Sequence, residues 1–160
     1  ATNAITILIG FPYHTDLVDE MLKLSKEELT HFEMVHQKIK DRGLKLGFER
    51  KDEYVGELYK FMRKGHKQEI VLIDRILFSA MIEARSCERF KLLSEQINDA
   101  DLKEFYRELM ISEAGHYTTF IGFARKYGSH VEDVDARWQQ WLDFEANLIK
   151  NYGKKETVHG

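Results

Sequence analysis

The sequence predicts an all-α protein, and composition and hydrophobic periodicity both lead to this expectation. The 160 residues include a single proline, and 43% of them are hydrophobic while 32% are charged. Most of the chain repeats apolar residues at steps of three and four, which is the spacing of one buried helix face. A chain of this length can bury a core of its own, so we expect one domain over residues 1–160.

Glycine, proline and capping residues set the expected helix boundaries. An opening apolar helix ends at Gly10-Phe11-Pro12. The next helix is capped by Thr15 or Asp16 and runs to about Asp41. The helices expected after it cover approximately residues 53–63, 67–97, 101–127 and 131–151.

A Glu-x-x-His pair, Glu113 and His116, interrupts the apolar face of the helix expected over 101–127. Residues three apart on a helix share one face, about 5–6 Å apart at Cβ. Both side chains therefore occupy core positions. A buried carboxylate costs several kcal/mol unless it is paired, protonated or bound to a cation. A metal ion would compensate the carboxylate and the imidazole together.

A second Glu-x-x-His pair, Glu28 and His31, lies on the apolar face of the helix expected before Asp41. A third apolar face, on the 67–97 helix, is interrupted by Glu83. One Glu from each of two helices and a Glu-x-x-His from each of the other two is the ligand pattern of ferritin-like dimetal bundles. We therefore expect a ferritin-like four-helix bundle with one long crossover, over 43–66, and an additional C-terminal helix.

Hairpin geometry selects Glu83 as a ligand in preference to Glu88. The turn between the two long helices centres near residue 98, so Glu83 lies level with Glu113, each about 15 residues from the turn. Glu88 would lie about 7 Å off that level and outside the apolar face. The same argument on the first hairpin puts the partner of Glu28 just before Ala1. We expect the beginning of that helix to be missing from this sequence, so a sixth ligand either precedes Ala1 or does not exist.

Five residues are thus the predicted ligands, and the predicted catalytic residues through the metals: Glu28, His31, Glu83, Glu113 and His116. An oxygen-rich set with two imidazoles suits two iron ions, or manganese, rather than zinc. Two ferrous ions bridged by carboxylates can deliver electrons to O₂ as co-substrate. One Glu-x-x-His alone arises often by chance on exposed helices, whereas two pairs with Glu83 favour a dimetal site.

The sequence around these ligands resembles the MiaE family of tRNA hydroxylases. The resemblance rests on Glu-Glu-Leu-Thr-His-Phe at 27–32, Ile-Glu-Ala-Arg-Ser-Cys-Glu-Arg-Phe at 82–90 and Ser-Glu-Ala-Gly-His-Tyr at 112–117. It implies a di-iron monooxygenase that hydroxylates the isopentenyl group of a 2-methylthio-isopentenyl-adenosine beside the tRNA anticodon. It also implies the same five ligands, a tRNA anticodon stem-loop as substrate and a separate electron-donating reductase.

Charge gives the RNA interpretation weak independent support. The net charge is −3, yet residues 38–67 contain ten basic and five acidic residues. This basic segment could contact tRNA phosphates or could be a solvated loop. The sequence does not decide whether Tyr54, Tyr59 or Phe61 stacks on a base. It also does not decide whether Arg85 and Arg89 lie behind the ligands or on the surface.

The remaining features favour a cytoplasmic protein, as a monomer or a small homo-oligomer. Cys87 is the only cysteine, which excludes an internal disulfide, and no apolar run is long enough to span a membrane. Two alternatives stay open. One is a ferritin- or rubrerythrin-like dimetal protein that oxidises iron or scavenges peroxide. The other is a metal-free helical interaction module, which leaves the buried acids unexplained.

Overall fold

The computed structural model of the protein describes residues 1–48 and 51–151, and every regular element in these ranges is an α-helix. The helices group into two compact units, Ala1–Lys51 and Asp52–Gly160. None of the helices in the described ranges is both long enough and apolar enough to cross a membrane. The all-α prediction is therefore confirmed for these residues, and the expectation of a single domain stays a prediction.

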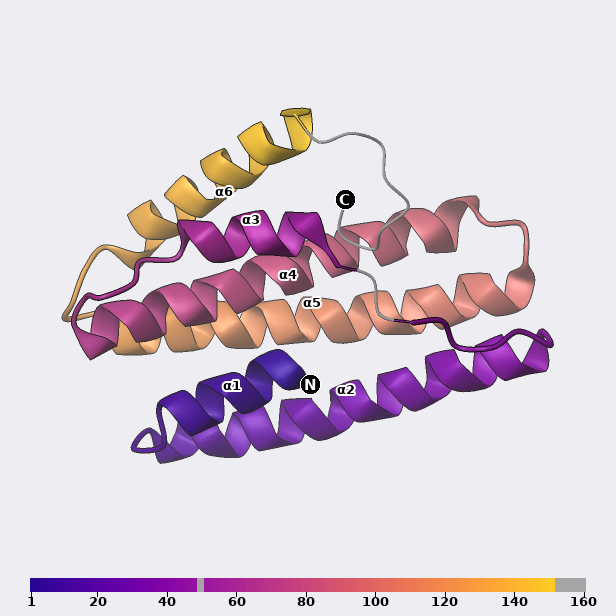
Figure 1. Cartoon of the computed structure of the whole chain (residues 1–160), viewed down its shortest axis with the longest axis horizontal. Coiled ribbons are helices and arrows are strands. Elements are labelled where there is room, and N and C mark those ends of the chain that lie inside the picture. The colour runs from indigo at the N-terminus through magenta and orange to yellow at the C-terminus, as the bar shows by residue number, and fades with distance from the viewer. Residues whose placement is uncertain (49–50, 152–160) are drawn as a thin grey trace. The chain divides into compact units, whose positions relative to one another are not determined.

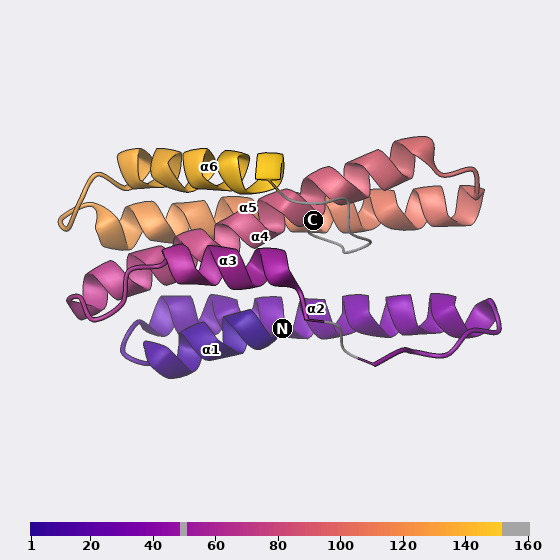
Figure 2. The same ribbon diagram turned by 45° about the horizontal axis from the view of Figure 1, so that its top comes forward.

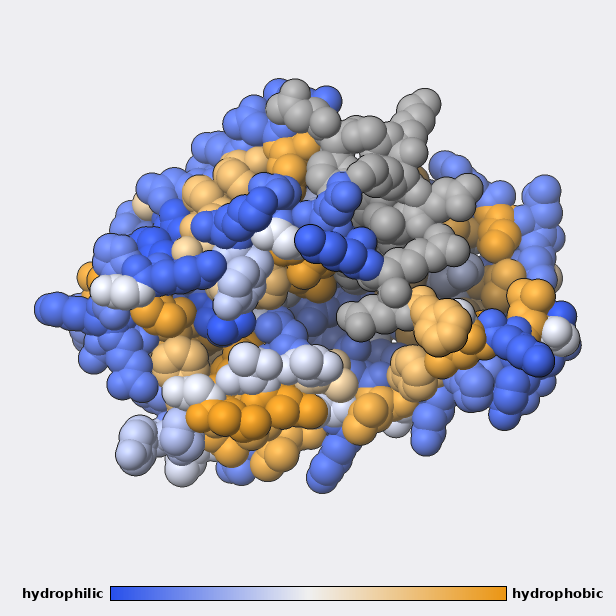
Figure 3. Space-filling model, viewed as in Figure 1, coloured by the Kyte–Doolittle hydropathy of each residue, from blue (hydrophilic) through white to orange (hydrophobic). Residues whose placement is uncertain are grey.

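The first unit is a helical hairpin. Helix α1 (Thr2–Gly10) lies antiparallel beside the N-terminal part of α2 (Thr15–Asp41), as Figures 1 and 2 show. Apolar residues at helical spacing form its core: Ala4, Ile7, Leu17, Met21 and Leu24. Other apolar side chains of α1 remain on the surface (Figure 3), where Ile9 is 69% exposed.

The second unit is built on two long antiparallel helices, α4 (Gln68–Gln96) and α5 (Ala100–Gly128) (Figure 1). Helices α3 (Glu53–Phe61) and α6 (Val134–Asn151) both contact α4 and each other. The first half of α4 is buried nearly all round, from Leu72 to Met81, as its apolar sequence predicts. This unit holds most of the aromatic core, including the fully buried Trp141.

Aspartate side chains begin three of these helices. Asp52 Oδ1 accepts a hydrogen bond from the backbone N–H of Val55, at 3.2 Å. Asp99 and Asp133 cap α5 and α6 in the same way. The expected cap of α2 is wrong: its N-cap is His14, without a side-chain hydrogen bond, and Thr15 is already the first helical residue. The other expected boundaries agree with the structure within about three residues.

Candidate metal centre

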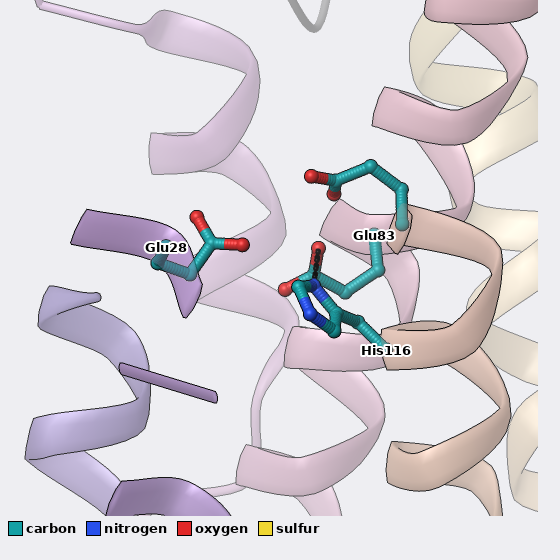
Figure 4. Close-up of side chains that lie close together, drawn as sticks. Glu28, Glu83 and His116 are labelled. Carbon is teal, nitrogen blue, oxygen red and sulfur yellow. Dashed lines mark ion pairs between the residues drawn. The ribbon is translucent and has the colours of Figure 1, made fainter. Parts of the chain in front are cut away.

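The α4–α5 pair brings three predicted ligands together. One ligand atom from each of Glu83, Glu113 and His116 lies within 4.8 Å of the other two. His116 Nδ1 lies 3.8 Å from Glu83 Oε2, and Figure 4 shows these two side chains pointing toward each other from facing helices. Glu83 and Glu113 therefore lie opposite each other on the two helices, as counting residues from the turn predicts.

These three side chains are buried. Glu83 is 9% exposed, and Glu113 and His116 are each 6% exposed. Two carboxylates this close repel each other when both are ionised, and burial removes the water that would screen them. A bound cation offsets both effects, and carboxylate oxygens with an imidazole nitrogen are donors that iron and manganese accept. The residues present therefore fit a metal site.

Two neighbours of this cluster bear on its electrostatics. Ser112 Oγ lies 3.5 Å from His116 Nε2, so the two ring nitrogens face different groups and Nδ1 is the one turned to Glu83. Burial first, and then the charge of Glu113, raises the pKa of the half-buried Cys87 thiol. A thiol with a raised pKa stays protonated at neutral pH, which disfavours Cys87 as a nucleophile.

The other predicted pair lies in the first unit. Glu28 and His31 follow one another by one turn of α2, and His31 Nδ1 lies 3.6 Å from Glu28 Oε1. Their side chains are 24% and 17% exposed, so they are half-buried rather than fully in the core as expected. The backbone nitrogen of Ala1 lies 3.7 Å from Glu28 Oε2. The N-terminal end of α1 is thus level with Glu28, as hairpin geometry predicts.

A buried ionic network in the second unit was not predicted from the sequence. Asp74 is fully buried on α4 and accepts hydrogen bonds from two arginines. Arg63 donates from its backbone N–H and its guanidinium, each at 2.7 Å, and Arg137 of α6 donates at 2.7 and 2.9 Å. Burial alone would raise the pKa of Asp74, yet the hydrogen bonds from Arg137 and Arg63 outweigh it and hold the pKa below its usual range. The signal was a lone aspartate within an apolar run.

The structure also places Arg85, which the sequence left open. Its Nε donates to Glu145 Oε1 at 2.9 Å, and Tyr54 donates to the same oxygen at 3.2 Å. Arg85 also pairs with Glu88 at 2.6 Å. Arg85 therefore links α4 to α3 and α6, on another side of α4 from Glu83.

Known proteins resemble this chain over most or all of its length. The family model described as tRNA-(MS[2]IO[6]A)-hydroxylase (MiaE) matches residues 1–160, the entire chain. The chain belongs to the MiaE family. This confirms the resemblance inferred from the residues around the predicted ligands.

Two curated relatives of this MiaE-family chain carry the name tRNA 2-(methylsulfanyl)-N(6)-isopentenyladenosine(37) hydroxylase. The Salmonella typhimurium protein is 34% identical over 148 residues, which are 92% of this chain and 53% of that protein. The Pseudomonas putida protein is 35% identical over 132 residues, which are 82% of this chain and 63% of that protein. The chain thus spans between about half and two thirds of the length of these relatives.

A solved structure shares the fold. It is described as protein 43 with aldehyde deformylating oxygenase activity from Synechococcus. The TM-score is 0.82 at 28% identity, and the match covers 99% of this chain and 76% of the other. Together with the all-helical structure, this likeness confirms the ferritin-like fold class that the sequence predicts.

Proposed function

We propose that this MiaE-family chain carries a dimetal centre with Glu28, His31, Glu83, Glu113 and His116 as ligands. The single observation that supports it most is the buried cluster of Glu83, Glu113 and His116, whose ligand atoms lie within 4.8 Å of one another. Glu28 and His31 complete the donor set by the pattern of two Glu-x-x-His pairs. Iron is the proposed metal, with manganese as the other ion that suits these donors.

The proposed reaction is O₂-dependent hydroxylation of the isopentenyl group of a modified adenosine in tRNA. The names of the two curated relatives and the matched family support this substrate, and no relative named above is a ferritin or a peroxidase. In the balanced reaction a C–H bond, O₂, two electrons and two protons give a C–OH group and water. Bound iron would supply the O₂ chemistry, and a separate reductase would supply the electrons. Because tRNA is the proposed substrate, we also propose a cytoplasmic location.

The chain's own contribution is to hold the donors and to exclude water. Phe105, Leu109 and Phe120 are buried on the same helix as Glu113 and His116. An apolar surround keeps water from the reacting group and suits a prenyl substrate, which is itself apolar. Ser112, near His116 Nε2, favours the ring orientation that turns Nδ1 toward Glu83.

A hydroxylation assay tests the proposal. Transfer RNA that carries 2-methylthio-isopentenyl-adenosine is incubated with the iron-loaded chain, a reductant and isotopically labelled O₂, and its nucleosides are analysed by mass spectrometry. We expect one labelled oxygen atom in the modified nucleoside. Glu83→Ala should abolish this product, because it removes a proposed ligand from the buried cluster.

A matched control lies on the same helix. Glu88 is 62% exposed at its side chain and pairs with Arg85, away from the cluster, so Glu88→Ala should keep the activity. Equal product with wild-type protein and Glu83→Ala would contradict the proposed ligand set. A folded, iron-loaded chain that leaves this nucleoside unchanged would contradict the proposed substrate.

A further inference from the structure

One exposed aromatic residue of the second unit is surrounded by cations. Tyr59, on α3, is 42% exposed, and its ring packs edge to face on the buried Phe78 with centroids 6.1 Å apart. Lys64 Nζ lies 4.2 Å from the centroid of the Tyr59 ring, and the guanidinium carbon of Arg75 lies 5.6 Å from it. Lys64 belongs to the connection after α3 and Arg75 to α4, so three segments meet at this ring.

The other two aromatics of this segment are not accessible in the same way. Tyr54 is fully buried, and its hydroxyl donates to Glu145. Phe61 stacks on Phe144 with ring centroids 4.2 Å apart and meets Trp141 edge to face. Of the three aromatics that the sequence left open for contact with a base, the structure therefore leaves Tyr59 on the surface.

The position of Lys64 is set by the residue before it. Arg63 fastens the connection to α4 through Asp74 and also pairs with Glu132, with contacts of 2.5 and 2.7 Å. Gly65, directly after Lys64, has a φ of +72°, a value that favours glycine. The anchored arginine and the glycine turn hold Lys64 over the Tyr59 ring.

The charges of Lys64 and Arg75 are not neutralised by a carboxylate within the described part of the chain. Both side chains contact the Tyr59 ring, whereas the neighbouring Lys60 is paired with Glu57 and Arg63 with Asp74. Two cations beside one ring repel each other, and a bound anion would offset this repulsion. Arg50, another cation of the basic segment, lies outside the described residues.

We propose that Tyr59, Lys64 and Arg75, here called the Tyr59 patch, bind the sugar-phosphate backbone of an RNA loop. Two cations held by an aromatic ring match the phosphates and unstacked bases of single-stranded RNA. Arg75 precedes Glu83 by eight residues on α4, which is about 12 Å along the helix axis. A loop that presents one base to the metal cluster can therefore reach the patch. This inference rests on the proposed tRNA substrate.

The test measures RNA binding without catalysis. A fluorescently labelled anticodon stem-loop with an unmodified adenosine is titrated with the 160-residue chain, and anisotropy is followed at several salt concentrations. We expect Lys64→Ala with Arg75→Ala to weaken binding about 10-fold or more. The slope of log affinity against log salt should become shallower by about 1.4, because two phosphate contacts are lost at about 0.7 each.

Lys126→Ala is the matched control. Lys126 also lies near a tyrosine ring, 5.8 Å from the centroid of Tyr127, but it belongs to α5, which contributes no residue to the patch. It should leave affinity and salt slope unchanged. Tyr59→Phe should bind like wild type, because it keeps the ring that holds the cations, and Tyr59→Ala should weaken binding. Should the double variant fail to fold by circular dichroism, Lys64→Glu tests the same claim at an exposed position.

Each outcome decides the inference. Equal affinity of wild type and a folded patch variant for the RNA overturns it. Wild-type protein that binds no RNA also overturns it, including a protein that binds anionic phosphatidylserine vesicles in a parallel titration but not the RNA. Its failure is distinguishable from failure of the proposed function. Patch-dependent RNA binding by a chain that holds no metal would contradict only the dimetal proposal. Metal-dependent hydroxylation that is unchanged in the patch variants would contradict only the RNA surface.

Discussion

At the scale of single residues, the cluster on α4 and α5 brings together two buried acids whose repulsion a bound metal ion would offset. Glu83 and Glu113 are nearly inaccessible to water and share one level of the helix pair with His116. Apolar packing alone does not explain two acids at adjacent core positions, because each buried carboxylate would cost several kcal/mol if it stayed uncompensated. The partners could be predicted from the sequence because antiparallel helices pair residues equidistant from their turn.

The Asp74 network could not be predicted in the same way. Its two arginines, Arg63 and Arg137, come from a connection and from α6, and neither stands at a helical spacing from Asp74. Such contacts depend on how α3, α4 and α6 pack, which periodicity does not contain. The sequence showed only that an acid interrupts the apolar first half of α4.

Asp74→Asn should lower the free energy of unfolding by about 3–5 kcal/mol, because two buried guanidinium groups lose their counter-charge. Urea unfolding at neutral pH measures this. Asp135→Asn is the control: Asp135 pairs with Arg125 at 2.8 Å but its side chain is 67% exposed, so its loss should cost no more than about 1 kcal/mol.

The free energies of unfolding of wild type and Asp74→Asn should depend differently on pH. The pKa of Asp74 lies below its usual range, so its contribution to stability is complete above about pH 5 and is lost as pH falls through the folded-state pKa. The difference in unfolding free energy between wild type and Asp74→Asn should therefore be constant near neutrality and narrow below about pH 4. A difference unchanged down to pH 2 would contradict this account.

At the scale of helices, the sequence predicts a boundary correctly where the residues at that boundary themselves end or cap the helix. Gly10-Phe11-Pro12 ends α1, and Asp99 begins α5 through a hydrogen bond to the backbone of Leu102. Helix α2 begins one or two residues earlier than expected. Thr15 and Asp16, the expected caps, lie in its first turn, where the charge of Asp16 favours the helix N-terminus. Near the end of α5, buried positions are spaced by four residues, at Phe120, Ala124 and Gly128. A helix with 3.6 residues per turn drifts from a strict alternation of steps of three and four.

Gly128, at the end of α5, leaves no room for a side chain. A Cβ on Gly128 would overlap Cγ2 of Val134 and lie 3.4 Å from Cδ1 of Ile73. Gly128→Ala should therefore lower the free energy of unfolding by about 1–3 kcal/mol, as overpacking does. Gly122→Ala, on the same helix with no atom within 4 Å of its Cβ, should be neutral or stabilising by up to about 1 kcal/mol. Thermal unfolding of both variants checks this, and equal effects would contradict it.

At the scale of the whole chain, the two Glu-x-x-His pairs belong to different compact units. Glu28 and His31 lie in the first unit, and Glu83, Glu113 and His116 in the second. Because ligands are proposed in both units, full metal binding should require residues of each. This prediction rests on the repetition of one motif, because two Glu-x-x-His pairs belong to the ligand pattern of ferritin-like dimetal bundles.

Elemental analysis of iron and manganese in the purified chain would show whether the five proposed ligands hold a dimetal centre. Four variants accompany the wild type: His31→Ala from the first unit, Glu83→Ala and His116→Ala from the second, and Glu88→Ala as the exposed control. The account predicts about two metal ions per chain in wild type and Glu88→Ala, and loss of metal in the other three. A folded wild type without iron or manganese, or full occupancy in Glu83→Ala and His116→Ala, would contradict it.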